Sequence, residues 1–147
     1  MTQHTDRPDQ VVEDHAGAVS VRLQLADVWV VTGAGGEVSC RFCEIANEIW
    51  PAVYVRKWPD AVAIQPLNPV VPGHVLVIPR AHVNDVTEDP IVAASTTARA
   101  AELAVPPCNL ITSAGAPATQ TVFHLHVHVV PRAVGDGLAL PWTERVS

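Results

Sequence analysis

Three histidines alternate with apolar residues late in the chain, in the run His-Leu-His-Val-His at residues 124–128. In a β-strand successive side chains point to opposite faces, so a strand here would place all three imidazoles on one face at steps of roughly 6.6 Å. Imidazole is the side chain that can act near neutral pH as nucleophile, general acid, general base or metal ligand. The pattern predicts that the chemistry takes place on this histidine face, while the intervening apolar side chains enter a core.

Phosphorus chemistry is one use for such a face. A neutral imidazole can attack phosphorus, and the phosphoramidate that forms is reactive enough for water to cleave it. One difficult displacement then becomes two easier ones. Neighbouring groups must stabilise charge on the phosphate oxygens and protonate the leaving group.

The net charge argues against one class of partner. The chain of 147 residues has 9 Lys and Arg against 15 Asp and Glu, a formal net charge of −6. This balance offers no basic surface for DNA or RNA, so we expect no long nucleic acid as partner. A small phosphorylated ligand remains compatible, because a few histidines, backbone amides and hydroxyls can hold one or two phosphates.

Two observations bear on the cellular compartment. We expect no membrane-spanning helix, because no run of about eighteen apolar residues is present, and the polar residues 1–8 lack the apolar core of a signal peptide. Both favour the reducing cytoplasm. In that compartment the pair Cys40-x-x-Cys43 indicates a thiolate pair for a metal rather than a disulfide. The alternative is free thiols packed as small hydrophobic groups, as expected for Cys108.

Composition divides the chain into four parts. Residues 1–18 are polar and predict a flexible tail. Residues 19–39 form an N-terminal extension, in which alternation over 19–31 predicts a strand or a hairpin. The main domain covers residues 40–132, and residues 133–147 follow it as a C-terminal tail.

Within the main domain the pattern predicts five strands. A hairpin is expected over residues 52–58 and 61–65, and a central strand over 73–78. Two further strands are expected over 109–113 and 120–130, the second of which carries the histidines.

One main helix is expected over residues 91–103, with Asp89 as N-cap and Pro90 in the first turn. The combination predicts an α+β fold, a mostly antiparallel sheet with one main helix packed on it. An apolar stripe at three-to-four spacing is expected to face the sheet; it consists of Ile91, Ala94, Ala98, Ala101 and Val105.

Three segments resemble one known family, and they occur in its order. They are residues 40–45 (Cys-Arg-Phe-Cys-Glu-Ile), residues 67–80 followed by His82, and residues 120–132 around the histidines. The chain resembles the histidine triad family of nucleotide hydrolases and transferases, in its zinc-bearing bacterial type, over roughly residues 40–132. The resemblance implies a five-stranded antiparallel sheet with one main helix, commonly in a homodimer that extends the sheet.

The resemblance also implies roles for individual residues. His126, the middle histidine, matches the nucleophile. His128 matches a donor to a phosphate oxygen or to the leaving group, and His74 matches a histidine beside the same phosphate. Thr121 matches a hydroxyl that contacts the bridging oxygen. Two further residues match side chains that hold the nucleotide or phosphate, namely Asn109 and Gln120.

A zinc site is implied in the same way. In zinc-bearing relatives the Cys-x-x-Cys pair is completed by the histidine after the Val-Ile-Pro strand and by the first triad histidine. Here these ligands are Cys40, Cys43, His82 and His124. Zinc binds such a set tetrahedrally and contributes directly to the free energy of folding.

The resulting hypothesis is an enzyme that hydrolyses or transfers a nucleotidyl group from a nucleoside phosphoramidate or a dinucleoside polyphosphate, through a covalent nucleotidyl-histidine intermediate. Two alternatives remain: a nucleotide-binding or regulatory module with little turnover, and a zinc-dependent hydrolase with catalytic metal on the triad. One departure bears on them. Pro66 stands where purine-binding members have an acidic residue that accepts hydrogen bonds from ribose hydroxyls, and proline has no such acceptor.

Overall fold

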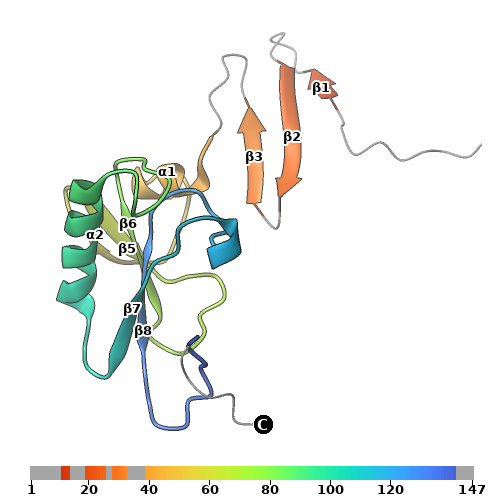
Figure 1. The fold of residues 1–147 in the computed structure, drawn as a ribbon. Coiled ribbons are helices and arrows are strands. Elements are labelled where there is room, and N and C mark those ends of the chain that lie inside the picture. Colours follow the sequence, from red (N-terminus) through yellow and green to blue (C-terminus); the bar gives the residue numbers. More distant parts are fainter. Residues whose placement is uncertain (1–10, 14–18, 26–27, 33–38, 142–147) are drawn as a thin grey trace, which may run out of the picture.

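The structure, a computed structural model, describes residues 11–13, 19–25, 28–32 and 39–141, the first three segments by their backbone alone. Its main body is a sheet of five strands in the order β4-β5-β6-β8-β7, in which every neighbouring pair is antiparallel (Figure 1). The strands are β4 (Tyr54–Lys57), β5 (Ala61–Ile64), β6 (Val75–Pro79), β7 (Cys108–Ile111) and β8 (Val127–Pro131). The predicted α+β fold is confirmed, with the strand expected over 73–78 at the centre of the sheet.

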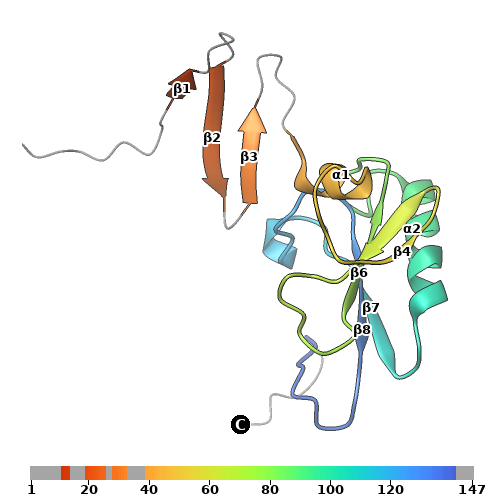
Figure 2. The same cartoon turned by 180° about the vertical axis from the view of Figure 1, so that it is seen from behind.

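One long helix, α2 (Pro90–Leu103), covers one face of this sheet (Figures 1 and 2). It begins as expected, because the Asp89 side chain accepts hydrogen bonds from the backbone N–H groups of Ile91 and Val92 at 2.9 and 3.1 Å. Such an N-cap is worth about 1 kcal/mol. The core beneath the helix consists of Trp58, Ala61, Ala63, Val77, Ala100, Val127 and Val129.

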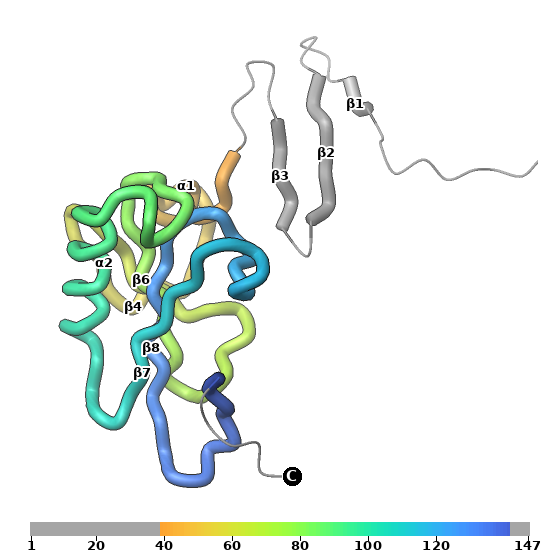
Figure 3. Tube along the Cα trace, in the orientation of Figure 1, coloured from red at the N-terminus to blue at the C-terminus, as the bar shows by residue number. Residues whose placement is uncertain are grey.

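The opposite face of the sheet is covered at one end by the short helix α1 (Arg41–Ala46). Ile45 and Ala46 of this helix pack against side chains of β5 and β6, namely Val62, Ile64, Leu76 and Ile78. Tyr54 ties the helix to β4, because its hydroxyl donates to Ile45 O at 2.8 Å. The loop that leads into β6 and the loop between β7 and β8 also lie on the side away from α2 (Figure 3).

The expected apolar stripe of α2 is wrong. The residues that the helix buries are Ala93, Thr96 and Ala100, whereas all five residues of the expected stripe are exposed: Ile91, Ala94, Ala98, Ala101 and Val105. Thr96 can be buried because its hydroxyl donates to Val92 O at 2.7 Å.

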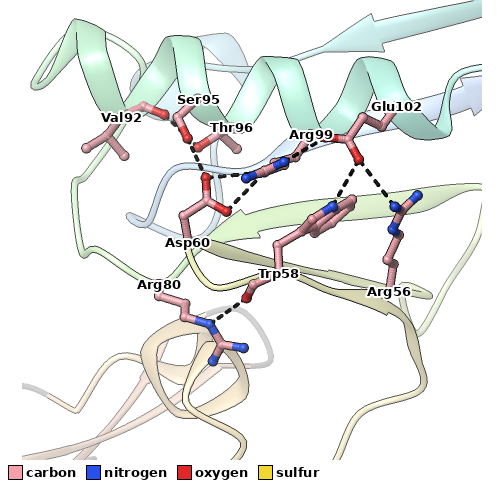
Figure 4. Close-up of polar contacts among 9 residues, drawn as sticks. All are labelled: Arg56, Trp58, Asp60, Arg80, Val92, Ser95, Thr96, Arg99 and Glu102. Atoms are coloured by element: carbon pink, nitrogen blue, oxygen red, sulfur yellow. Dashed lines mark hydrogen bonds and ion pairs between the residues drawn. The ribbon is translucent and has the colours of Figure 1, made fainter.

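Polar contacts along one flank set this rotation of the helix (Figure 4). Asp60, in the turn between β4 and β5, accepts hydrogen bonds from Ser95 Oγ at 2.7 Å and from Arg99 Nε at 3.0 Å. One turn further on, Glu102 accepts a hydrogen bond from Trp58 Nε1 at 3.0 Å. These contacts fix which side of the helix faces the sheet, and hydrophobic periodicity does not contain that information.

The expected strand over residues 120–130 is too long. Strand β8 begins only at Val127, so His128 lies in it while His124 and His126 precede it. Strand β7 ends at Ile111 and offers no further ladder to the preceding segment. Instead, Leu125 N donates to Val83 O at 2.7 Å, and the Leu125 side chain is buried with Val83 and Ala93.

The N-terminal segments form a separate three-stranded antiparallel sheet of β1 (Val11–Glu13), β2 (Val19–Leu25) and β3 (Val28–Thr32). Of the two forms expected for residues 19–31, a strand or a hairpin, the structure shows the hairpin. Strand β1 lies within the expected tail, and the remainder of that tail lies outside the described residues. None of the helices in the described part of the chain has the length and hydropathy needed to span a bilayer.

Candidate active site and metal centre

The histidine face is the face of the sheet opposite α2. In the ladders of β8, His128 is paired with Leu76 on one side and Ile111 on the other, so it projects to the same side as Leu76, away from the core under α2. His126 lies two residues earlier in the chain and is buried, with 8% of its surface exposed. His74, directly before β6, is also buried. The structure thus brings together the three histidines expected to act on phosphate.

The tautomer of His126 follows from its hydrogen bond. Its Nδ1 lies 2.8 Å from the carbonyl oxygen of His124. A carbonyl only accepts, so Nδ1 must carry the proton, and the lone pair of the neutral ring is on Nε2. Burial lowers the pKa of His126. The ring is therefore neutral near pH 7, with an unprotonated nitrogen on the edge away from the His124 carbonyl.

A second chain of hydrogen bonds sets the tautomers of His74 and His128. The backbone N–H of Val70 donates to His74 Nδ1 at 3.2 Å, so His74 carries its proton on Nε2. That nitrogen lies 2.9 Å from His128 Nδ1 and donates to it, which leaves the His128 proton on Nε2. Burial lowers the pKa of both rings, that of His128 to about 4. His128 is thus a neutral hydrogen-bond donor near pH 7, not a charged acid.

The four expected metal ligands form one cluster. The ligand atoms of Cys40, Cys43, His82 and His124 all lie within 4.8 Å of one another. The hydrogen-bond-range distances among them are 3.1 to 3.5 Å. Tetrahedral zinc with bonds of about 2.0 to 2.3 Å separates its ligand atoms by roughly 3.3 to 3.8 Å, so the set fits zinc in its chemistry, and four of its six ligand pairs lie near this spacing.

Two further features suit this cluster to a metal. His124 has no exposed surface, and its Nε2 lies 2.9 Å from Pro79 O, to which it donates, so its Nδ1 is free to face the cysteines. Burial, followed by the neighbouring Cys40, raises the pKa of Cys43 to about 12. The Cys43 thiolate therefore forms near neutral pH only when a cation replaces its proton.

The three remaining candidate residues have different surroundings. Gln120 is buried, and its amide nitrogen donates to Asn84 O at 2.6 Å and to Val122 O at 3.1 Å, while its oxygen accepts from Gly115 N at 2.7 Å. Its side chain thus joins two loops. The neighbouring Thr121 is exposed beside the histidine segment.

Asn109 lies on β7 opposite Val130, two pairs beyond the level of His128. Its Oδ1 accepts from Arg132 Nη1 at 2.6 Å. The guanidinium of Arg132 is itself held by Asp136 at 2.7 Å. Closer to His126 is Thr112, whose hydroxyl donates to His126 O at 2.9 Å.

Sequence reasoning missed two contacts at the centre of the site. One is the Val70 amide, which no residue-type pattern identifies. The other is Phe42, between the two cysteines, whose ring meets that of His126 edge-on with centroids 5.2 Å apart. Its place inside the Cys-x-x-Cys segment is the only signal that could have drawn attention to it.

Known proteins with similar sequences identify the family of this chain. The family model described as HIT domain matches residues 47–135, more than half of the chain. The chain belongs to the HIT family. An uncharacterized HIT-like protein of Mycobacterium tuberculosis is 34% identical over 111 residues, covering 69% of this chain and 76% of that protein. Adenylylsulfatase HINT3 of Arabidopsis thaliana is 32% identical over 108 residues, covering 67% of this chain and 55% of that protein.

A solved HIT structure resembles the whole domain. A Zn-bound histidine triad family protein from Mycobacterium smegmatis superposes with a TM-score of 0.60 at 37% identity, covering 69% of this chain and 80% of that one. The fold is thus that of a HIT protein, and one solved HIT protein of similar fold is zinc-bound.

Proposed function

We propose that this HIT protein hydrolyses or transfers a nucleotidyl group through a covalent intermediate on His126 Nε2. The observation that carries the proposal is the hydrogen bond from His126 Nδ1 to His124 O, which leaves the other ring nitrogen unprotonated in a neutral imidazole. A buried neutral imidazole with a fixed tautomer is the form that attacks phosphorus.

In the first step Nε2 forms a bond to phosphorus while the bond from phosphorus to the leaving group breaks. The ring then becomes a positively charged phosphorylated imidazolium, and its Nδ1–H···O=C bond to His124 strengthens as that charge develops. In the second step water attacks the same phosphorus and releases a proton to bulk solvent, and the P–N bond breaks to return neutral His126. An acceptor hydroxyl in place of water gives transfer.

His128 would stabilise the phosphate in both steps. Its Nε2–H donates to a non-bridging oxygen, and His74 holds it in the donor form. With a pKa of about 4, His128 holds no extra proton to give near pH 7. The leaving group is therefore best when it departs without needing a proton, and the exposed hydroxyl of Thr121 and the Asn109 amide would contact it or the nucleotide.

Three substrate classes test this chemistry: a nucleoside phosphoramidate, a dinucleoside polyphosphate, and adenylyl sulfate, suggested by the name of the Arabidopsis relative. Sulfate leaves as a stable anion, whereas an amine must be protonated. A small nucleotide is the expected partner, and Pro66 predicts weak discrimination between ribose and deoxyribose forms.

We also propose a structural zinc ion on Cys40, Cys43, His82 and His124, which would join α1 to the loops around the triad. Such a site suits the reducing cytoplasm. It differs from a catalytic zinc on the triad, because His124 belongs to the cysteine–histidine cluster and His128 carries its proton on Nε2, which leaves His126 Nε2 as the one triad nitrogen with a free lone pair.

A homodimer is the expected assembly. Helix α2, which carries the exposed apolar stripe, contacts β7, an edge strand on which Leu110 is partly exposed. Pairing of two β7 edges would cover both. Light scattering of the wild type and of Ala98→Glu, which places a charge in the stripe, checks this: the variant should be monomeric.

The decisive experiment incubates the full chain with each of the three substrates, quenches in base, and searches for a nucleotidyl adduct by mass spectrometry. We expect turnover, with an adduct on His126, and loss of at least 10³-fold in kcat for His126→Ala. Thr97→Ala, on the exposed side of α2, is the control. Undiminished turnover in His126→Ala would refute the covalent route, and absence of turnover and adduct with all three substrates would favour a binding module.

A further inference from the structure

The first turn of α1 joins the metal cluster to the proposed nucleophile. Phe42 lies between Cys40 and Cys43, so its backbone is held on both sides by candidate metal ligands. Its ring contacts His126 with centroids 5.2 Å apart and planes at 89°, and His124 with centroids 6.1 Å apart and planes at 73°. One aromatic side chain therefore touches both a metal ligand and the imidazole proposed to attack phosphorus.

The His126 ring needs this support because its hydrogen bond leaves one motion free. The bond from Nδ1 to His124 O anchors one edge of the imidazole. The χ2 torsion of histidine is broad, so a ring anchored at one edge can still swing its Nε2 edge away from a target. An aromatic ring set perpendicular to the imidazole blocks such a swing. Displacement of a reacting atom by about 1 Å costs on the order of 10²-fold in rate.

We propose that Phe42 is a positioning residue for His126, through which the closed cysteine–histidine cluster fixes the direction of the nucleophilic nitrogen. Two routes lead from the cluster to the ring. His124 supplies the carbonyl that sets the tautomer, and α1 supplies the aromatic edge that sets the orientation. The role in rate rests on the proposed function; the ordering of the His126 ring does not.

The other contacts of α1 make this coupling specific to Phe42. Ile45 and Ala46 pack on the aliphatic side chains of β5 and β6 and have no aromatic contact with the triad. Tyr54 holds the helix through Ile45 O, on the side of β4. A change at Tyr54 therefore removes a hydrogen bond to α1 at Ile45 and leaves the Cys-x-x-Cys turn with its Phe42 ring in place, which makes Tyr54→Phe a matched control.

The test compares wild type, Phe42→Leu, Phe42→Ala and Tyr54→Phe, each as the zinc-loaded full chain. We expect kcat to fall about tenfold in Phe42→Leu and about 100-fold in Phe42→Ala, with KM nearly unchanged, because a swinging nucleophile spends less time aimed at phosphorus. Tyr54→Phe should retain the wild-type kcat. A rise in KM with kcat unchanged would make Phe42 a substrate contact and would overturn the proposal.

A second readout needs no activity. In ¹⁵N-edited spectra the His126 ring of the zinc-loaded wild type should give one sharp set of resonances with the proton on Nδ1. Phe42→Ala should broaden that set, and chelation should broaden it in the wild type but add little in Phe42→Ala. If Phe42→Ala fails to fold, the same spectra are recorded for Phe42→Leu, in which the His126 resonances should also broaden.

The two readouts separate this inference from the proposed function. If the His126 ring is ordered in the wild type and loosens in the Phe42 variants, but the protein shows no turnover, the positioning role of Phe42 stands and the proposed enzymatic function is refuted. If turnover proceeds through His126 but the His126 resonances are unaltered in both Phe42 variants, the proposed function stands and the positioning role of Phe42 is refuted.

Discussion

His74 Nε2 lies 2.9 Å from Nδ1 of His128, and the direction of this hydrogen bond is set by a backbone amide, because Val70 N–H occupies the other nitrogen of His74. A main-chain group thus determines which nitrogen of His128 carries the proton at the phosphate. His74 needs no contact with substrate to matter for the reaction, since its effect passes through His128.

Replacement of His74 should test this relay. We expect His74→Leu to lower kcat by roughly 10- to 100-fold, because His128 loses the donor that holds its proton on Nε2. His74→Gln, whose amide N–H can still donate, should recover part of that loss. The tautomer of His128, read from its ring ¹⁵N shifts, should change in the leucine variant only. Equal kcat values for the two variants would contradict the relay.

The buried histidines also predict how stability depends on pH. Burial lowers the pKa of His128 from 6.5 to about 4 and lowers that of His74 as well. Between about pH 6.5 and pH 4 the unfolded chain binds a proton at His128 and the folded chain does not, so the free energy of unfolding falls as pH falls through this window, and the lowered pKa of His74 acts in the same direction. Above about pH 7 neither state binds protons there, and their contribution is constant.

Urea unfolding of the protein at pH 7, 6 and 5 measures this effect. The slope between pH 7 and 5 should be smaller in His74→Leu, which removes one of the groups. A free energy of unfolding that stays constant over this range would show that these rings are not excluded from protonation in the folded state.

Local signals predicted most of the fold. The Asp89 cap, the hairpin turn between residues 58 and 61 and the central strand expected over 73–78 depend on a few neighbouring residues, and each is found where the sequence indicates. The inward face of α2 was predicted wrongly, because Asp60, some 35 residues away in the sequence from Ser95, decides it through side-chain hydrogen bonds.

The site, like the fold, was predicted from the sequence only in part. Alternation placed His126 and His128 together, although the strand proper begins only at Val127. The metal cluster joins Cys40 to His124 over 84 positions, and only resemblance to a family could pair them. Phe42 could not be predicted, because its role depends on where a short helix meets the sheet.

Removal of metal should reveal the proposed zinc site. We expect one zinc per chain, a lower melting temperature after chelation, and loss of zinc in Cys43→Ser. Because the pKa of the metal-free Cys43 thiol is raised to about 12, binding displaces a proton and the affinity should increase about tenfold per pH unit for each proton released. Calorimetry in two buffers of different ionisation enthalpy counts those protons.

Cys108 provides the control, since it lies on β7 apart from the cluster. Cys108→Ser should bind zinc as the wild type does. Equal zinc content in Cys43→Ser and the wild type would contradict the ligand assignment.

Replacement of Gln120 should lower the stability of the fold, an effect that a glutamine in a loop does not by itself suggest. Its amide bonds with Gly115, Asn84 and Val122, and therefore holds the loop before the triad against the segment that follows His82. Gln120→Leu keeps a similar volume but leaves a partly buried N–H and partly buried carbonyl oxygens without their partner, which costs about 1–3 kcal/mol of unfolding free energy. Thr121→Ala, next to it but exposed, should change that free energy by less than about 0.5 kcal/mol. Urea midpoints at constant m-value measure both, and equal midpoints for the two variants would show that the Gln120 amide does not hold the loop.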